Sequence, residues 1–396
     1  MSRGVPTLKS AVIAFSVLLA LLGLNSCSSY NAPSQSQSAP TSKIAPRAFV
    51  SNSIANRLQI VDAGKDQLSL QFNISVGSQP ALMVLAPNKQ LTLVFNAGNS
   101  SVSVVNNAQE TQTATLALQS FTESIVISPD SNSAFAALPG AVTLGQPTGV
   151  LQLLDLVNNR TKARIPIPEI RRVVINHTGN RLLAFSDNAD SVTIVDLTKI
   201  GVSPPLTVVP GFNRPVSAVF SDDDSTAFIL NCGSECGGTA ASVIPLNMGS
   251  NALGAAIPVS GATIGALLNG NLYVAGSASG SGTLQVVNPS SLTASAPVNI
   301  GNGFHDLMQL GSDNKLFIGA RQCTTGCLSI FDISNQAVVI DPSAGDVTGI
   351  EPIANRSVVY VCEGGELRIF DTTTSAPSST AFIDIVGEAI DVREVD

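Results

Sequence analysis

Four of the six cysteines form two pairs with the same spacing, Cys232 and Cys236 in NCGSECGG and Cys323 and Cys327 in RQCTTGC. In an exported chain such pairs form disulfides. Each bond would close only a small loop, so it would stiffen that loop modestly instead of holding the fold. The alternative is a zinc site, which needs four cysteine and histidine ligands in one place. We expect two disulfides, a buried thiol at Cys362 and no metal.

Only two histidines are available for acid–base chemistry, His177 and His305. We expect His177, in the turn NHTG, to be exposed and without a role. His305 precedes Asp306, but neighbouring residues of a strand point to opposite faces, so the two do not make a catalytic pair. The segment SDDDST (221–226) places three carboxylates in one turn, where we expect a solvated bend and not a calcium loop.

Sequence signatures of common enzymes are missing. There is no Gly-x-Ser-x-Gly motif, no phosphate-binding loop before a helix and no Cys-x-x-Cys-His motif for haem. The net charge of −8 and the pI near 4.8 argue against nucleic acid, because binding phosphates requires clustered lysine and arginine. We therefore expect no cofactor and no nucleic-acid partner. Whether the chain is an enzyme stays open, with a noncatalytic role favoured.

The remaining cysteine, Cys27, follows a segment of the export type. Arg3 and Lys9 precede an apolar run over residues 11–24, which is the layout of a cleaved secretory signal. The run is shorter than the ~20 residues of a membrane-spanning helix. The tetrapeptide LNSC (24–27) resembles the lipobox of bacterial lipoproteins, whose cysteine is lipidated and becomes the first residue of the mature chain. The alternative is an ordinary secreted protein in which Cys27 has no such function.

This interpretation divides the chain into three parts. Residues 1–26 are expected to be a lipoprotein signal peptide. Residues 27–46 are expected to be the lipidated cysteine and a disordered tether, because they are rich in serine, glutamine and proline. Residues 47–396 are expected to be one domain. Acyl chains would hold the protein on a membrane, and Ser28 in place of an aspartate fits the outer membrane, with the domain facing the periplasm or the cell surface.

A paired strand pattern recurs throughout residues 47–396. LTLVFNAGNSSVSVVNN (91–107) can be laid over RLLAFSDNADSVTIVDL (181–197) and over RSVVYVCEGGELRIFDT (356–372). Eight copies end on an Asp or Asn, at positions 62, 106, 155, 196, 247, 288, 332 and 371. Their spacing of 39 to 51 residues is typical of four-stranded propeller blades. Successive apolar residues in the first two strands of a copy predict sheets covered on both faces. The fold class expected is therefore all-β, a single β-propeller.

The repeats resemble the YVTN-type β-propeller repeats of exported bacterial and archaeal proteins. The resemblance rests on AFVSNS and NRLQIVD within 48–62, on ISVGSQPALMVLAPNKQLTLVFNAG (74–98), and on SPD at 128–130. It implies a propeller, commonly with seven blades, and says little of function. We expect eight four-stranded blades here, because residues 388–395 read as a strand that completes the first blade and closes the ring. Seven blades are the alternative.

The same alignment places a set of polar residues where an outer strand passes to the next inner strand, at the mouth of the central channel. These possible ligand-binding residues are Glu123, Arg171, Arg172, Arg214, His305, Asp346 and Glu388. The function expected is a membrane-tethered binding or scaffold module, acting as a monomer on an envelope protein or glycan. The alternative is a hydrolase or lactonase-like enzyme with its site at the channel mouth.

Overall fold

The Asp or Asn that closes each repeat ends the third strand of a four-stranded antiparallel sheet. In all eight copies its side chain accepts a hydrogen bond from a backbone N–H two or three residues further on, as Asp62 does from Gly64 and Asn106 does from Gln109. Turns of this kind reverse the chain, and here they lead into the fourth strand. The polar residue that marks the repeat in the sequence is therefore the residue that folds it.

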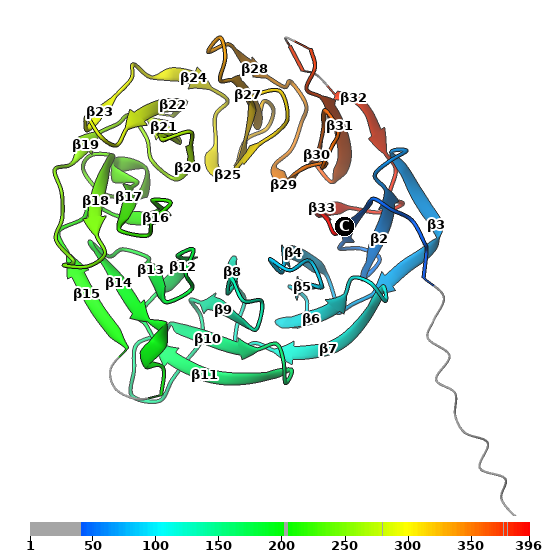
Figure 1. Cartoon of the computed structure of the whole chain (residues 1–396), viewed down its shortest axis with the longest axis horizontal. Coiled ribbons are helices and arrows are strands. Elements are labelled where there is room, and N and C mark those ends of the chain that lie inside the picture. The colour runs from blue at the N-terminus through cyan, green and yellow to red at the C-terminus, as the bar shows by residue number, and fades with distance from the viewer. Residues whose placement is uncertain (1–40, 202–204, 279, 375, 378) are drawn as a thin grey trace, which may run out of the picture. The chain divides into compact units, whose positions relative to one another are not determined.

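The computed structural model describes residues 41–201, 205–278, 280–374, 376–377 and 379–396. In these ranges the eight repeats form eight sheets arranged as blades around a central channel (Figure 1). The fold is an eight-bladed β-propeller, which confirms the all-β class and the count of eight. The helical residues of the described chain form two short 3-10 helices, η1 (Leu197–Lys199) and η2 (Gly233–Cys236).

The strands of each blade run from the channel outward in the following order. Blades 1 to 4 are β33 (Ala389–Glu394), β1 (Arg47–Asn52), β2 (Arg57–Asp62), β3 (Gln67–Ser75); β4 (Pro80–Leu85), β5 (Leu91–Asn96), β6 (Ser101–Asn106), β7 (Thr111–Ala117); β8 (Ser124–Ile127), β9 (Ser133–Leu138), β10 (Val150–Asp155), β11 (Arg160–Pro166); and β12 (Ile170–Ile175), β13 (Arg181–Ser186), β14 (Ser191–Asp196), β15 (Leu206–Pro210). Blades 5 to 8 are β16 (Pro215–Phe220), β17 (Thr226–Asn231), β18 (Ser242–Asn247), β19 (Ile257–Pro258); β20 (Ile264–Leu268), β21 (Asn271–Ala278), β22 (Ser281–Asn288), β23 (Thr293–Ala294) with β24 (Val298–Ile300); β25 (Phe304–Leu310), β26 (Lys315–Arg321), β27 (Leu328–Asp332), β28 (Val338–Ile340); and β29 (Val347–Pro352), β30 (Val358–Glu363), β31 (Glu366–Asp371), β32 (Ser379–Ile383).

The hydrophobic core is divided among the interfaces between blades. Eight clusters of buried apolar residues exist, and each joins two neighbouring blades. Within β5, for example, Leu93 and Phe95 pack toward blade 3 whereas Val94 packs toward blade 1. Successive residues of a strand point to opposite faces, and both faces are covered. This is why the inner strands are apolar at consecutive positions, as the sequence predicts.

The C-terminal strand closes the ring. β33 pairs with β1 as the innermost strand of blade 1, as expected from the sequence. Its charged side chains also reach both neighbouring blades, because Asp391 accepts a hydrogen bond from the N–H of Met83 in blade 2 at 2.7 Å, and Glu394 accepts one from the N–H of Ala354 in blade 8 at 2.6 Å. One strand thus connects the two ends of the repeat array.

The segment before the first blade lies partly within the described residues. The signal peptide expected at 1–26, the lipidation site Cys27 and the tether up to residue 40 lie outside them. In residues 41–46, the backbone N–H of Ser42 donates to Glu110 at 2.6 Å, and Ile44 packs on the cluster between blades 1 and 2. None of the helices in the described ranges is long and apolar enough to cross a membrane.

Candidate binding face

Two kinds of loop lie on the same face of the ring. Because strand direction alternates within each blade, the loops that lead into first strands and the loops between second and third strands lie at the same end of the blades. We call this end the entry face. All seven residues predicted at the channel mouth lie in these loops or in the first three residues of an inner strand. The repeat therefore predicts correctly where these seven residues lie along the chain. Their burial and their contacts differ from one residue to the next.

A bulge recurs where the inner strands begin. The register shifts near the start of the inner strand in six blades, for example between Ile170 and Arg172 in β12 and between His305 and Leu307 in β25. A bulge adds one unpaired residue and re-aims the side chains around it. The strict alternation expected for His305 and Asp306 does not apply at this point. Their side chains nevertheless do not pair, since each has a different partner.

Arg171 and Glu123 join two blades at the rim of the entry face. Arg171 binds Glu123 through Nη1 at 3.2 Å, and it binds Asp187 through Nη2 at 2.5 Å and Nε at 2.8 Å. The hydrogen bonds that Arg171 donates to Asp187, opposed by burial, raise the pKa of Arg171. Both predicted residues are half exposed and carry opposite charges. They form a fixed polar contact between blades 3 and 4.

The other predicted rim residues also have protein partners. Asp190 accepts a hydrogen bond from the backbone N–H of Arg214 at 3.1 Å and lies 3.8 Å from its guanidinium. Asp346 accepts a bond from the N–H of Gln322 at 2.8 Å, and Glu388 accepts one from the hydroxyl of Ser53. The mouth is thus lined by carboxylates that are each engaged by a neighbour. Within the described residues, no three carboxylates bring their oxygens within 4.8 Å of one another.

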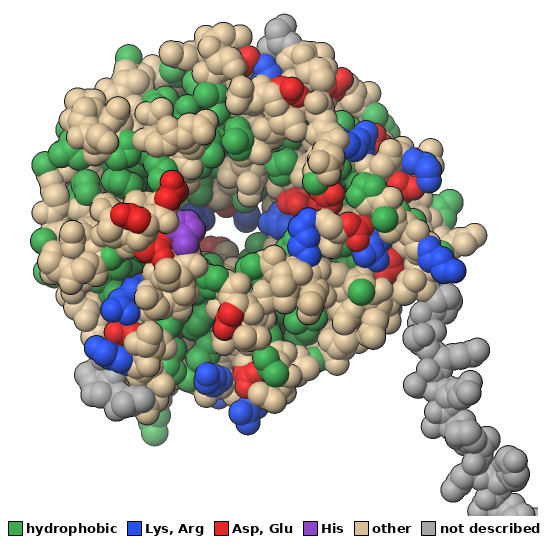
Figure 2. Space-filling model, in the orientation of Figure 1, with side chains coloured by type: hydrophobic (Ala, Val, Ile, Leu, Met, Phe, Trp, Pro, Cys, Tyr) green, Lys and Arg blue, Asp and Glu red, His purple; other side chains and the backbone are tan. Residues whose placement is uncertain are grey.

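Arg172 in blade 4 is affected by charges that belong to other blades. Burial lowers the pKa of Arg172, whereas the negative charge of Asp306 raises it. Blades 4 and 7 are not neighbours, so the charge of Asp306 acts on Arg172 from a distant blade of the ring. Asp306 pairs with Arg321 at 2.9 Å. On the face opposite the entry face, Figure 2 also shows acidic and basic side chains around the central opening. The sequence does not indicate this influence of Asp306 and Arg321 on Arg172, because the three residues belong to blades that only the curvature of the ring brings near one another.

The side chain of His305 is buried below the loops of the entry face and is not part of its surface. Its side chain is 1% exposed, and its Nε2 lies 3.0 Å from the carbonyl oxygen of Gly301. Its backbone carbonyl accepts a hydrogen bond from the hydroxyl of Thr263 at 2.6 Å, which links blades 6 and 7. Burial lowers the pKa of His305 to about 4, so the ring is neutral at neutral pH. In this arrangement His305 lies buried at the junction of blades 6 and 7. The exposed His177 instead pairs with Asp224 at 2.7 Å.

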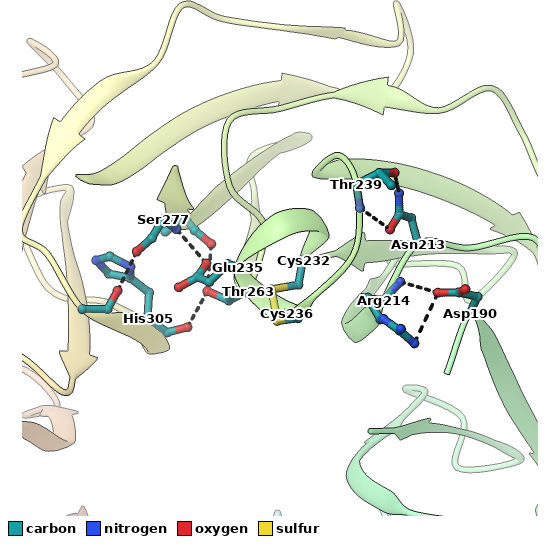
Figure 3. The surroundings of a disulfide bond; sticks show 12 residues. Asp190, Asn213, Arg214, Cys232, Glu235, Cys236, Thr239, Thr263, Ser277 and His305 are labelled. Atoms are coloured by element: carbon teal, nitrogen blue, oxygen red, sulfur yellow. Dashed lines mark hydrogen bonds and ion pairs between the residues drawn. A yellow bond between two sulfur atoms is a disulfide. The ribbon is translucent and has the colours of Figure 1, made fainter. Parts of the chain in front are cut away.

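Both predicted disulfides are present on the entry face. Cys232 pairs with Cys236 and Cys323 pairs with Cys327, in the loops between the second and third strands of blades 5 and 7. Figure 3 shows the first loop, where the carboxylate of Glu235 accepts a hydrogen bond from the N–H of Ser277 at 2.9 Å. The pairs do not combine into a four-ligand zinc site. As expected, the remaining thiol in the described chain, Cys362, is buried, and burial raises its pKa.

Exposed apolar side chains occupy entry-face loops of blades 1 and 3. They belong to blade 1, to the loop between blades 2 and 3, and to the long loop of blade 3. They are Ile54 (72% exposed), Val386 (69%), Phe121 (47%), Val142 (68%) and Leu144 (100%). The sequence alone does not single them out, because apolar residues in a strand-rich chain are expected in the core. Their position in turns is the feature of the sequence that indicates exposure.

Two hollows lie on the opposite face. One, of about 460 Å³, is lined by residues of blades 1 and 8 that include Arg356 and Asp396. The other, of about 370 Å³, lies between blades 3 and 4 and includes Asp130 and Lys162. Neither contains a residue predicted at the channel mouth. The candidate binding face is therefore a rim of loops around the channel and not a deep pocket.

Comparison with known proteins supports the fold alone. No family model and no curated protein matches the sequence. Dihydro-heme d1 dehydrogenase NirN, solved in complex with DHE, aligns at 12% identity over 88% of this chain and 75% of its own, with a TM-score of 0.66. A functionally unknown protein from Desulfotomaculum acetoxidans aligns at 20% identity over 74% of this chain and 94% of its own (TM-score 0.55).

A third solved structure is the Swd1 β-propeller domain of Myceliophteria thermophila. It aligns at 10% identity over 72% of this chain and 94% of its own, with a TM-score of 0.53. These neighbours include a named enzyme and a domain named only by its fold. The propeller architecture is therefore compatible with either catalysis or binding.

Proposed function

We propose that this chain is a lipid-anchored, extracytoplasmic β-propeller of the YVTN-repeat type that acts as a noncatalytic binding or scaffold module. A lipid on Cys27 holds it at the outer membrane, and the entry face contacts another envelope protein. The two disulfides support an oxidising, extracytoplasmic location. The anchor and the partner are the parts of the proposal that need experiment.

The observation that carries the binding role is the group of exposed apolar side chains on the entry face. Val142 and Leu144 lie in one loop of blade 3 and are 68% and 100% exposed. Apolar side chains that gather on one face of a protein mark contact sites for other proteins. They favour a protein over a glycan as the partner. The rim charges beside them, such as Glu123 and Arg171, are held by each other and supply a rigid polar border.

Replacing Cys27 by serine tests the anchor. We expect Cys27→Ser to move the protein from the membrane fraction to the soluble fraction, because the mature chain then loses its acyl chains. Cell fractionation followed by immunoblotting, together with mass spectrometry of the N-terminal peptide, measures this. A variant that stays in the membrane fraction, with no lipid found on the parent, contradicts the proposed anchor. Crosslinking of the parent in intact envelopes then identifies the partner.

A further inference from the structure

Cys323, Cys327 and Asp346 lie together on the entry face where blades 7 and 8 meet. Within the described residues, they are the one group of three Cys, His, Asp or Glu side chains whose ligand atoms all lie within 4.8 Å of one another. Cys327 is buried, whereas Cys323 and Asp346 are partly exposed, so water and small ions can reach the group. Two sulfurs and a carboxylate oxygen are ligands that zinc accepts.

Two hydrogen bonds, in addition to the disulfide, hold Asp346 beside the cysteine loop. Its carboxylate accepts a hydrogen bond from the N–H of Gln322 at 2.8 Å, directly before the cysteine loop. The N–H of Gly345 donates to the carbonyl of Thr324, inside that loop, at 3.1 Å. These contacts hold the carboxylate beside the loop from the neighbouring blade. Breaking the S–S bond therefore leaves the three ligand groups adjacent.

We propose that this group is a redox-controlled zinc site. In the disulfide form the two sulfurs are bonded to each other and do not bind metal. A dithiol reductant transfers two electrons to the bond: the reductant becomes a disulfide, and Cys323 and Cys327 become thiols. Zn²⁺ then binds both sulfurs and Asp346, displacing the two thiol protons, and water takes the fourth position.

The backbone already suits both states. The Cα atoms of Cys323 and Cys327 are 5.8 Å apart, and three residues separate the cysteines, which falls within the spacing of cysteine pairs in zinc sites. With Zn–S bonds of about 2.3 Å, tetrahedral geometry needs the sulfurs roughly 3.8 Å apart. Side-chain rotation can supply this separation. With three protein ligands and partial exposure, the site resembles an open zinc site more than a closed structural one.

The other disulfide loop is an internal control. Cys232 and Cys236 have the same spacing, so the two loops differ in the groups around their sulfurs and not in the cysteines themselves. In the part of the chain that the structure describes, no Cys, His, Asp or Glu completes a ligand group there. A dithiol without a third ligand binds zinc weakly, so we expect the metal only at the blade 7 loop.

The experiment titrates Co²⁺, a spectroscopic substitute for Zn²⁺, into purified chain that carries Cys27→Ser so that Cys27 contributes no thiol. After reduction with a phosphine we expect one Co²⁺ per chain, with a sulfur-to-cobalt charge-transfer band that Zn²⁺ abolishes. The oxidised chain should show no band. Cys232→Ser with Cys236→Ser should keep the band, and Cys323→Ser with Cys327→Ser should lose it. Asp346→Asn should weaken affinity by at least the roughly tenfold that loss of an outer-shell partner costs.

Circular dichroism of each reduced variant confirms that the blades remain folded before metal is added. The proposal is overturned if the reduced parent shows no band, if the band survives Cys323→Ser with Cys327→Ser, or if the oxidised chain binds Co²⁺ equally well. Unchanged affinity in Asp346→Asn overturns the role of the carboxylate. The outcome does not depend on the anchor or on the partner of the entry face.

Discussion

Glu363 is a buried carboxylate whose protonation affects the stability of the ring. Glu363, at the end of β30, has no exposed surface, and neither of its carboxylate oxygens has a hydrogen-bond partner in the described chain. The nearest cation, Arg368, lies 3.5 Å away and also pairs with Glu366 at 2.8 Å. Burial raises the pKa of Glu363 from 4.5 to about 7. Its charged form is therefore disfavoured in the folded state.

We predict that Glu363→Gln stabilises the protein at pH 8 and has little effect at pH 4. In the unfolded chain Glu363 loses its proton near pH 4.5, whereas in the folded chain it keeps the proton up to about pH 7. The stability of the parent therefore falls as pH rises between these values. Glutamine removes this penalty, which is worth up to about 2 kcal/mol after allowance for screening. Thermal unfolding at both pH values measures the difference.

Glu366→Gln is the matched control for this prediction. Its carboxylate is exposed and pairs with the same arginine. Exposed pairs contribute roughly 1 kcal/mol or less, so this variant should show no gain at pH 8. If Glu363→Gln changes the melting temperature equally at both pH values, the buried carboxylate is not the titrating group.

For single residues, the sequence predicts on which face of the ring a side chain lies better than it predicts which residues that side chain contacts. The repeat placed Arg171, Arg214 and Asp346 at the entry face because every blade turns at the same point. It could not indicate that the charge of Asp306 acts on Arg172, because that influence depends on the curvature of the whole ring. Nor could it show that His305 is covered, since a bulge in β25 decides which way the neighbouring side chains point.

At the scale of the element, β33 has the largest influence on the fold. It buries Val392 and pairs with β1 along its length, and Val395, directly after it, is buried as well. Arg393 also donates to the carbonyl of Met83 at 3.2 Å and lies 3.6 Å from Glu351. The strand therefore contributes backbone pairing, apolar burial and charge contacts to three blades at once. Without it, the inner edge of β1 is open and the interfaces on both sides lose packing.

We predict that removal of residues 387–396 destabilises the entire ring. Burial of Val392 and Val395 contributes about 1.5–3 kcal/mol each, and the pairing with β1 adds to this. The melting temperature should fall by about 10 °C or more. Calorimetry measures the change. Removal of Asp396 alone is the control, because its pair with Arg47 is partly exposed and is worth roughly 1 kcal/mol. A truncated chain that melts within about 2 °C of the parent contradicts closure by β33.

The elements themselves follow from the sequence more fully than the site does. Each third strand ends at the Asp or Asn that the repeat marks, so its boundary is set by a local turn, as at Asp371 and Thr373. The outer strands are less predictable, because they have one exposed edge and few packing constraints. Blade 6 shows this: two short strands, β23 and β24, both pair with β22 where other blades have one outer strand.

At the scale of the whole molecule, the two faces of the ring differ in chemistry. The entry face carries both disulfides and the exposed apolar loops of blades 1 and 3. The opposite face carries the two hollows, with polar residues such as Asp130 and Lys162. Loop length and sequence vary freely on a propeller because the blades supply the core. The exposed apolar side chains of the entry face therefore indicate that this face, and not the opposite one, contacts a partner.

Blade 3 allows a matched comparison of the two faces. Val142 lies in the entry-face loop between β9 and β10, and Val157 lies in the opposite-face loop between β10 and β11. They are 68% and 67% exposed. We predict that Val142→Ser weakens binding of the crosslinked partner by about tenfold, because an apolar side chain buried at the contact contributes about 1.5 kcal/mol or more. Val157→Ser should leave binding unchanged. Since neither side chain is packed in the core, both variants should melt like the parent, and equal binding by the two variants would place the contact away from the blade 3 entry-face loop.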